Sequence, residues 1–330
     1  MLSLGKLLEL SLAGREPAEK IQVTSRGVKL HWLSDGVLQV TPPASDDCGV
    51  DLLLSAGIHG NEIIPIELLD RLIRAVARGD LRPRARLLFL FGNLDAIRRG
   101  VRHLGNDLNR LFCGAHVEAG GAEAMRAMEL ERMTSSFFSL EGRTRRHYDL
   151  HSAMRPSQLS QFAICPWRNG RALPEGALER LRAASMEGVL MQRAASTTFS
   201  AYTANEHGAE AFTLELAEQS AARWPDCLQA FERAMQAQIL DQPLATGPAL
   251  GSFQVFSVAR EIIKRSERFR LCLPSDVENF AQLAPGTLLA EDGEDDRWIV
   301  EEEEARILFP MAQVAIGQRA GLVVVPGEPA

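Results

Sequence analysis

The sequence predicts an α/β fold, a mixed central sheet flanked by helices, with a smaller C-terminal β domain, and three observations support this prediction. Between residues 51 and 242, short apolar runs alternate with longer amphipathic segments, as strands and helices do in α/β domains. After Pro243 the chain changes to short β-like runs separated by proline and glycine. A length of 330 residues is enough for two such units. We therefore predict a larger domain over residues 1–245 and a β domain over residues 246–330.

The larger domain is predicted to begin with three antiparallel strands that turn at Arg26-Gly27 and Asp35-Gly36. The later strands are short apolar runs, and the helices are longer segments with apolar residues at helical spacing. The predicted strands of this domain are 21–23, 28–32, 37–40, 52–57, 87–91, 148–150, 161–165 and 211–216. The predicted helices are 63–78, 122–138, 175–193 and 225–241. The β domain is predicted to contain strands at 253–258, 269–273, 287–290, 307–309 and 322–325.

The composition is that of an ordinary folded chain with an acidic charge balance. Apolar residues make up 46%, and a net charge of −7 argues against general nucleic-acid binding, because phosphate contacts need basic surface. The five cysteines form no C-x-x-C pair, a pattern that suits reduced thiols better than disulfides. Lys6 and Glu9 interrupt the apolar N-terminal stretch, and no uncharged apolar run reaches about 18 residues, so neither a signal peptide nor a membrane span is expected. We predict a cytoplasmic protein without a membrane or nucleic-acid partner.

A histidine and a glutamate three residues apart form the strongest local signal. They lie in Gly57-Ile58-His59-Gly60-Asn61-Glu62, where a predicted buried strand ends and a helix begins. A tight turn there can aim both side chains at one point, and imidazole and carboxylate groups suit zinc. A lone H-x-x-E is common by chance, but a third candidate ligand, His151, follows the predicted strand 148–150. Two neighbouring ligands and one distant ligand, with a fourth position open to water, are the pattern of a catalytic zinc site.

A catalytic zinc site also needs a base for its water, and Glu215 is the candidate. It is the one charged residue in the apolar run Phe212-Thr213-Leu214-Glu215-Leu216. Because an unpaired buried carboxylate is costly, such a residue tends to have a partner or a task. The alternative interpretation is a glutamate at a solvated strand end.

A basic cluster between Arg98 and Arg110 stands out in this acidic sequence. Charge runs of this kind are commonly solvated surface loops. The last four residues, Asp107-Leu108-Asn109-Arg110, also carry amide and guanidinium groups, and arginine binds carboxylates through paired hydrogen bonds. An anionic substrate is therefore predicted. The sequence contains no dinucleotide-binding glycine motif, P-loop, G-x-S-x-G elbow or H-E-x-x-H motif, which disfavours redox and nucleotide chemistry.

Four motifs in a fixed order resemble those of the succinylglutamate desuccinylase and aspartoacylase branch of the carboxypeptidase A superfamily. They are G-x-H-G-N-E at 57–62, D-x-N-R at 107–110, D-L-H at 149–151 and T-L-E-L at 213–216. Residues 149–155, 309–310 and 314–322 are most similar to the desuccinylases of that branch. The resemblance extends through most of the chain and implies a zinc carboxypeptidase-like catalytic domain. It also implies hydrolysis of N2-succinyl-L-glutamate to succinate and L-glutamate, the last step of arginine catabolism by the succinyltransferase pathway.

Carried over residue by residue, the resemblance implies one Zn²⁺ per chain, bound by His59, Glu62 and His151, with Glu215 as the general base. Asp107 would orient a ligand histidine, as metal sites commonly require. Arg102 would polarise the scissile carbonyl group. The implied contacts with substrate carboxylates are made by Asn109, Arg110 and Arg155. The implied partner is a small anionic N-acyl amino acid.

The sequence departs from the aspartoacylase pattern at two points. Aspartoacylase takes a site tyrosine from its C-terminal domain, whereas Tyr148 and Tyr202 both lie outside that domain here. Asn205 stands ten residues before Glu215, where aspartoacylase has an arginine. Both departures argue against N-acetylaspartate as substrate. Two alternatives remain: a related deacylase or metallocarboxypeptidase acting on another acyl amino acid, and a catalytically silent metal- or carboxylate-binding protein with this fold.

Overall fold

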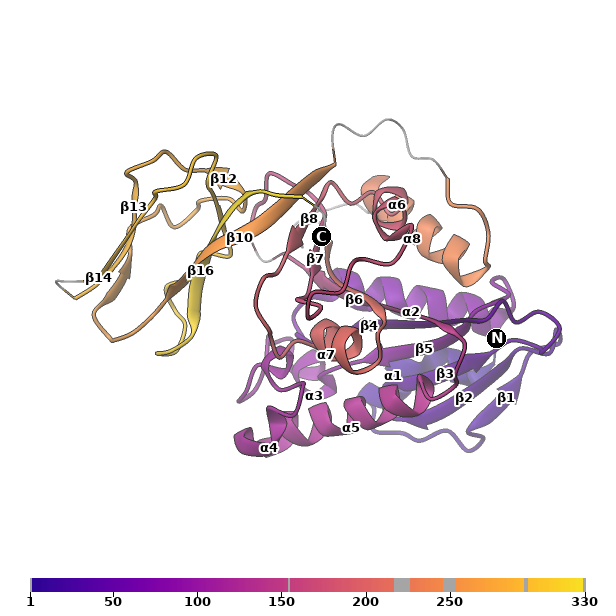
Figure 1. Cartoon of the computed structure of the whole chain (residues 1–330). Helices are drawn as coiled ribbons and strands as arrows, with labels where there is room; N and C mark the ends of the chain where they lie inside the picture. Colours follow the sequence, from indigo (N-terminus) through magenta and orange to yellow (C-terminus); the bar gives the residue numbers. More distant parts are fainter. Residues whose placement is uncertain (1, 154, 217–225, 246–252, 294–295, 329–330) are drawn as a thin grey trace.

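The apolar runs of the sequence pair into one long mixed sheet, which continues into the C-terminal part of the chain (Figure 1). The structure, a computed structural model, describes residues 2–153, 155–216, 226–245, 253–293 and 296–328. Within these residues, 13 strands of this sheet lie in the order β1-β2-β3-β5-β4-β6-β9-β7-β8-β10-β16-β15-β12. Their bounds are β1 (Ile21–Val23), β2 (Lys29–Ser34), β3 (Val37–Thr41), β4 (Val50–Ala56), β5 (Arg86–Phe91), β6 (Thr144–Ser152), β7 (Phe162–Cys165), β8 (Gly188–Met191), β9 (Glu210–Leu216), β10 (Gln254–Ile263), β12 (Ala281–Gln282), β15 (Arg306–Leu308) and β16 (Arg319–Pro326). A second sheet contains β11 (Phe269–Leu271), β13 (Leu288–Asp292) and β14 (Asp296–Ile299).

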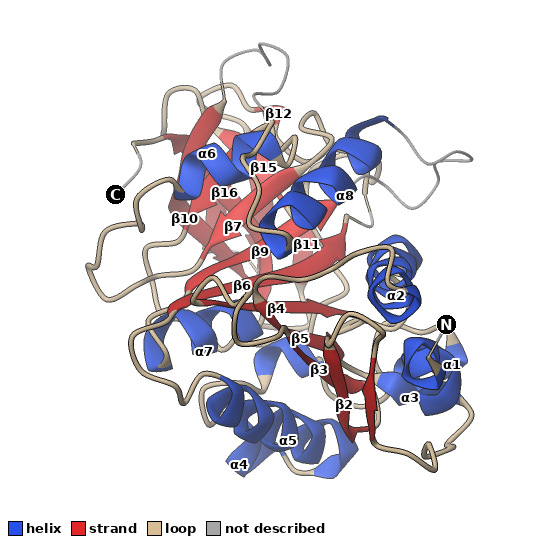
Figure 2. Ribbon diagram, turned by 90° about the vertical axis from the view of Figure 1, so that its right-hand side faces the viewer, coloured by secondary structure: helices blue, strands red, loops and turns tan. Residues whose placement is uncertain are grey.

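Helices pack on both faces of the central strands (Figure 2). Residues of α2, α6 and α8 pack in one apolar cluster with the sheet, and residues of α5 and α7 pack in a second cluster. The α-helices are α1 (Leu7–Leu12), α2 (Ile63–Arg78), α3 (Leu94–Arg99), α4 (His116–Ala119), α5 (Gly121–Phe137), α6 (Ala177–Ala183), α7 (Phe199–Glu206) and α8 (Asp226–Ile239). The short 3-10 helices are η1 (Ser3–Lys6) and η2 (Leu108–Arg110). None of the helices in the described part of the chain combines the length and apolar character needed to cross a bilayer.

Parallel pairing at the centre of the sheet brings the candidate residues to one edge. β4 pairs in parallel with β5 and β6, and β6 pairs in parallel with β9. β4, β5 and β9 are buried on nearly their whole length, which explains their nearly continuous apolar runs in the sequence. β6 is more polar, and its last six residues are buried. The carboxyl ends of β4, β6 and β9 therefore meet at the same edge, where α/β sheets build their sites.

The predicted fold class is confirmed, but the predicted helix 175–193 is wrong. The chain forms α6 over the first part of this segment and then the buried strand β8. Ser185 has a φ of 60°, in the left-handed region that ends a helix. A Cβ atom on Gly188 would lie 2.7 Å from the Gln254 backbone oxygen, so this glycine allows β10 to pair closely with β8. The apolar run of β8 fits a central strand as well as a helix, and periodicity alone does not distinguish them.

Five of the described C-terminal strands match predicted strands: β10, β11, β13, β15 and β16. The short strands β12 and β14 and the connection to the central sheet were not predicted. β10 pairs in parallel with β8, and β16, β15 and β12 extend the sheet beyond it. Apolar residues from both parts of the chain form one cluster at this junction. The Phe280 ring lies 4.9 Å from the Phe162 ring and 5.0 Å from the Phe256 ring, measured between centroids. The C-terminal part is therefore fixed against β7 and β8, and β7 pairs with β9, which carries Glu215.

Candidate active site

Two glycines shape the loop that carries His59 after β4. Gly57 has a φ of 68°, and a Cβ atom there would lie 2.6 Å from the Ile97 side chain. A Cβ atom on Gly60 would lie 2.1 Å from the Ala96 backbone, so only glycine lets the loop pack this closely against α3. The loop turns between β4 and α2 and directs the side chains of His59 and Glu62 toward the end of β6.

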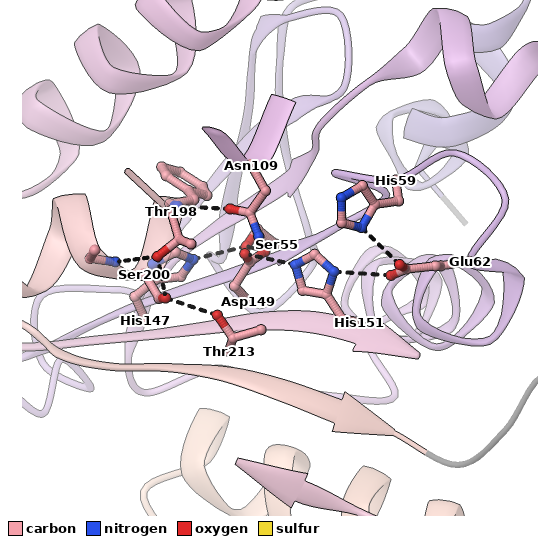
Figure 3. A network of polar contacts seen from close by, with 12 residues as sticks. Ser55, His59, Glu62, Asn109, His147, Asp149, His151, Thr198, Ser200 and Thr213 are labelled. Atoms are coloured by element: carbon pink, nitrogen blue, oxygen red, sulfur yellow. Dashed lines mark hydrogen bonds and ion pairs between the residues drawn. The ribbon is translucent and has the colours of Figure 1, made fainter. Parts of the chain in front are cut away.

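The three predicted ligands meet around the Glu62 carboxylate (Figure 3). His59 Nδ1 lies 2.8 Å from Glu62 Oε1, and His151 Nδ1 lies 3.0 Å from Glu62 Oε2. One ligand atom from each residue lies within 4.8 Å of the others, and all three side chains are buried. These distances allow the three side chains to hold one metal ion.

Each imidazole has its second nitrogen against another carboxylate. His59 Nε2 lies 2.9 Å from Asp107 Oδ1, and His151 Nε2 lies 3.0 Å from Asp149 Oδ2. Asp107 thus lies where the sequence predicted an orienting carboxylate. In metal sites, a histidine ligand commonly donates its free ring N–H to such a carboxylate, which fixes the ring and its tautomer. The Nδ1 atoms therefore face the candidate metal position while the Nε2 atoms face their orienting partners.

The electrostatics of the group follow from this close packing of opposite charges. Burial pushes the pKa of Glu62 upward, but His151 and His59 outweigh it and hold that pKa below its usual value. Burial pushes the pKa of His151 downward, but Asp149 and Glu62 outweigh it and hold that pKa well above its usual value. Asp107 likewise keeps a lowered pKa despite its burial, because His59 donates to it. The site is a set of mutually compensated buried charges, as a metal centre requires.

A buried polar chain supports Asp149 from the side opposite His151 (Figure 3). Ser55 Oγ donates to Asp149 Oδ1 at 2.6 Å and lies 2.8 Å from His147 Nε2. His147 Nδ1 lies 2.8 Å from Thr203 Oγ1. Burial lowers the pKa of His147 to about 4, so this imidazole is neutral at neutral pH. The hydrogen-bonded series of Ser55, His147 and Thr203 thus orients Asp149 without adding a second positive charge beside His151.

The sequence prediction did not include Asp149 as an orienting residue, although its spacing of two residues from His151 on a predicted strand could have indicated this role. Side chains two residues apart in a strand lie on the same face, so Asp149 must accompany His151 on β6. Ser55 is paired in register with Asp149 on the neighbouring strand β4, an association that only the sheet register reveals. The partners of Asp149 were therefore not predictable before the pairing of β4 with β6 was known.

Glu215 lies beside the ligand group on β9. It is paired in register with His151, and parallel neighbours in register share one face of the sheet. Its side chain is buried, and burial raises the pKa of Glu215 to about 7, against the opposing charges of His151, His59 and Arg102. A carboxyl group with this pKa can both take and return a proton near neutral pH. The alternative interpretation, a glutamate at a solvated strand end, disagrees with the buried position of Glu215.

The predicted substrate contacts lie near this region, with Arg102 in the loop before η2 and with Asn109 and Arg110 in η2. Arg102 Nη1 donates to Glu62 Oε1 at 3.3 Å, and its Nη2 lies 3.9 Å from Asp107 Oδ2. Asn109 is buried, and its Oδ1 accepts from the Phe199 N–H at 3.0 Å. Arg110 is exposed and donates to the Asn109 backbone oxygen at 3.0 Å. This segment is therefore packed against the ligand group and is not a free surface loop.

Arg155 contacts the C-terminal part of the chain. Its Nη1 donates to the backbone oxygens of Ser275 and Val277, both at 2.8 Å. Its Nη2 donates to the backbone oxygen of Pro310 at 3.0 Å. These bonds give Arg155 a structural task in joining the end of β6 to the C-terminal strands, a task that the sequence did not suggest.

The fold and the His-Glu-His group together define an α/β protein with a mixed central sheet and a possible metal site at one edge of it. Two family descriptions match the chain. The succinylglutamate desuccinylase/aspartoacylase catalytic domain matches residues 48–241, and the AstE/AspA barrel-sandwich hybrid domain matches residues 251–327. The chain belongs to the succinylglutamate desuccinylase/aspartoacylase family, which confirms the resemblance noted in the sequence motifs.

Full-length relatives and solved structures agree with this assignment. The chain is 54% identical over 332 residues to succinylglutamate desuccinylase of Ectopseudomonas mendocina (strain ymp), with 99% of this chain and 98% of that protein covered. It is 55% identical over 333 residues to succinylglutamate desuccinylase of Pseudomonas aeruginosa (strain UCBPP-PA14), with 99% and 100% covered. The crystal structure of succinylglutamate desuccinylase from Vibrio cholerae superposes with a TM-score of 0.87 at 31% identity, covering 97% of this chain and 94% of that chain. The corresponding structure from Chromobacterium violaceum gives 0.84 at 33% identity, with 98% of each chain covered.

Proposed function

We propose that the protein hydrolyses N2-succinyl-L-glutamate to succinate and L-glutamate. The observation that carries this proposal is the identity of 54–56% along almost the whole chain with relatives named succinylglutamate desuccinylase. The close arrangement of His59, Glu62, His151 and Glu215 in one buried group is what such a hydrolysis requires. The reaction would be the last step of arginine catabolism by the succinyltransferase pathway, in the cytoplasm.

The residues of the site fit one Zn²⁺ per chain, held by His59, Glu62 and His151. Two imidazoles and one carboxylate form a donor set of the kind found in catalytic zinc sites. The two Nδ1 atoms face the Glu62 carboxylate, and both Nε2 atoms have carboxylate partners, so the ligands are already oriented. A zinc ion bound there would act as a Lewis acid and lower the pKa of water to about 7.

Side chains of the protein carry out the proton transfers and stabilise the developing negative charge. Glu215 takes a proton from the water whose oxygen attacks the succinyl amide carbon. Arg102 donates hydrogen bonds to the carbonyl oxygen as negative charge develops on it. The carbon–nitrogen bond then breaks, and Glu215 returns its proton to the departing nitrogen, which leaves as the amino group of L-glutamate.

The remaining assigned residues bind the substrate or orient the ligands. Asn109 and Arg110 bind a substrate carboxylate, which suits a substrate with three carboxylates. Among the described residues, the Arg155 guanidinium bonds to three backbone oxygens, which leaves two of its five N–H donors, and we retain it as a further carboxylate contact. Asp107 and Asp149 orient His59 and His151 respectively. Residues 1–245 form the catalytic domain in this proposal, and residues 246–330 form the C-terminal β domain that fixes one side of the site.

The direct test is a succinate-release assay with and without a metal chelator. The purified protein is expected to release succinate from N2-succinyl-L-glutamate, to lose this activity on chelation and to regain it with zinc. N-acetyl-L-aspartate and a peptide with a free C-terminus, at equal enzyme concentration, distinguish the related deacylase and carboxypeptidase alternatives. Failure of the metal-loaded protein to hydrolyse any of the three would favour a silent binding protein instead.

Asp149→Asn should weaken metal binding without removing a ligand. The amide is neutral, so it no longer offers the His151 N–H a negatively charged acceptor. Loss of such an orienting carboxylate typically costs about 10- to 100-fold in metal affinity. Competition with a chromophoric chelator measures the change. Asp51→Asn is the matched control, because Asp51 is also buried but binds Arg86 and Arg143. Equal zinc affinity in Asp149→Asn and the wild type would exclude an orienting role.

A further inference from the structure

A polar cleft lies at the edge of the central sheet opposite the candidate metal site. Its volume is about 580 Å³, which is enough for a small molecule. The cleft lies where β6 and β9 begin, and its lining includes Arg145, Arg146, Arg180 and Glu210. His151 stands six residues after Arg145 on β6, which at about 3.3 Å per residue of strand is about 20 Å away. A small molecule bound in the cleft would therefore not reach the candidate metal position.

Two adjacent arginines of the cleft have no carboxylate partner. Arg145 Nη1 donates to the His207 backbone oxygen at 3.0 Å, and its Nη2 donates to the Leu140 backbone oxygen at 3.2 Å. Arg146 forms no hydrogen bond with the residues that the structure describes, and neither arginine forms an ion pair with them. The Nε atoms of both side chains are buried without a hydrogen-bond partner among these residues. Because arginine stays charged in proteins, the cleft has two positive charges that no carboxylate binds, in a chain of net charge −7.

The buried carboxylate of the cleft is bound by a different arginine. Glu210 is in register with Arg146, but its Oε1 accepts from Arg180 Nε at 2.9 Å and from the Tyr148 hydroxyl at 2.7 Å. Its Oε2 also accepts from Arg180 Nε, at 3.1 Å. Arg180 therefore neutralises Glu210, and Arg146 keeps an unbound guanidinium group on the neighbouring strand.

The remaining charges of the lining limit the size of an anion that the cleft can bind. Arg143 donates to Asp47 at 2.8 Å and is also paired with Asp51, so its charge is compensated within the protein. Glu141 and Glu175 line the cleft as well, and both are exposed. Their carboxylates would repel a long polyanion such as a nucleic acid, but one compact anionic group can lie at the two unpaired arginines. The cleft therefore suits a small anion.

We propose that this cleft is a second ligand site, in which Arg145 and Arg146 bind a small oxyanion, a carboxylate or a phosphate group. Successive residues of a strand point to opposite faces of the sheet, so the two guanidinium groups approach the cleft from both sides of β6. Guanidinium groups bind both kinds of oxyanion through paired, charge-assisted hydrogen bonds. A bound oxyanion gives Arg146 the acceptor that it lacks. This site lies outside the proposed catalytic group and does not depend on the substrate of that group.

Isothermal titration of the zinc-loaded protein with inorganic phosphate, and separately with malonate, tests the site. The candidate metal site also attracts anions, so the informative quantity is the difference between the wild type and Arg146→Gln. The substitution should raise the Kd of the cleft for the anion that binds more tightly by about 10- to 100-fold, because a charged hydrogen-bond donor is lost. Tighter binding of phosphate assigns a phosphate ligand to the cleft, and tighter binding of malonate assigns a carboxylate ligand.

Arg132→Gln is the matched control, because Arg132 is an exposed arginine on α5 outside the lining of the cleft. It removes the same charge and should leave both Kd values within about twofold of the wild type. Arg146→Lys keeps the charge without the planar group and should retain part of the affinity. Arg145→Gln should reproduce the loss even if Arg146→Gln does not fold. A wild type that binds neither anion, an affinity that Arg146→Gln leaves unchanged, or an equal loss in Arg132→Gln would overturn the inference.

Discussion

Glu215→Gln is expected to lower kcat by about 10²- to 10⁴-fold while the protein keeps its full metal content. The amide has the same shape as the carboxyl group but cannot take a proton from water, so the proton transfers of the reaction are lost. The three ligand side chains do not include Glu215, and its buried position on β9 tolerates an uncharged group. Succinate release measures kcat, and elemental analysis of the same sample measures zinc per chain.

Glu210→Gln is the matched control for this substitution. Glu210 is also a buried glutamate on β9, but it accepts from Arg180 and Tyr148 at the opposite end of the strand from Glu215. Its replacement should cost stability, because Arg180 loses its charged partner, and should leave kcat nearly unchanged. If Glu215→Gln retains most of its activity, Glu215 is not the general base, whatever the activity of Glu210→Gln.

The site was predictable from the sequence where short motifs coincide with strand ends. His59 and Glu62 follow β4 directly, and His151 and Glu215 lie at the ends of β6 and β9, so parallel pairing of these strands brings all four together. The apolar runs of β4 and β9 indicate their positions, because strands buried on both faces read as continuous apolar segments. β6 is more polar, and of its residues Thr144–Ser152 only 148–150 were predicted as a strand. Local sequence therefore contained both the chemistry of the site and the edge of the sheet on which it lies.

The features that the sequence did not predict depend on contacts between distant segments. The predicted helix 175–193 includes β8, because the apolar run of β8 is recognisable as a strand only once β7 and β10 pair with it. Arg155 has no local pattern that tells where its guanidinium group lies. Its position is fixed by hydrogen bonds to the backbone oxygens of Ser275, Val277 and Pro310 in the C-terminal part of the chain. Contacts between distant segments, and not local secondary-structure propensity, determine these features of the structure.

His151→Ala is expected to abolish metal binding, and with it the activity. Removal of one of three protein ligands leaves His59 and Glu62, which are neighbours in one turn and cannot enclose an ion from a second side. It also leaves Asp149 and Glu62 without the imidazole that neutralises them, which disfavours the metal-free fold. Elemental analysis should find close to one zinc ion per chain in the wild type and close to none in the variant.

Thermal unfolding provides an independent measurement of the same loss. A ligand that binds only the folded protein stabilises it by about 2.7 kcal/mol at a concentration 100 times its Kd, so zinc should raise the Tm of the wild type. The Tm of His151→Ala should not respond to zinc, whereas His207→Ala should respond as the wild type does. His207 Nε2 lies 3.3 Å from Ser135 Oγ and 3.4 Å from the Tyr202 hydroxyl oxygen, outside the ligand group and its orienting partners. Full zinc occupancy in His151→Ala would mean that the imidazole at the end of β6 is not a ligand, and the mechanism built on it would fail.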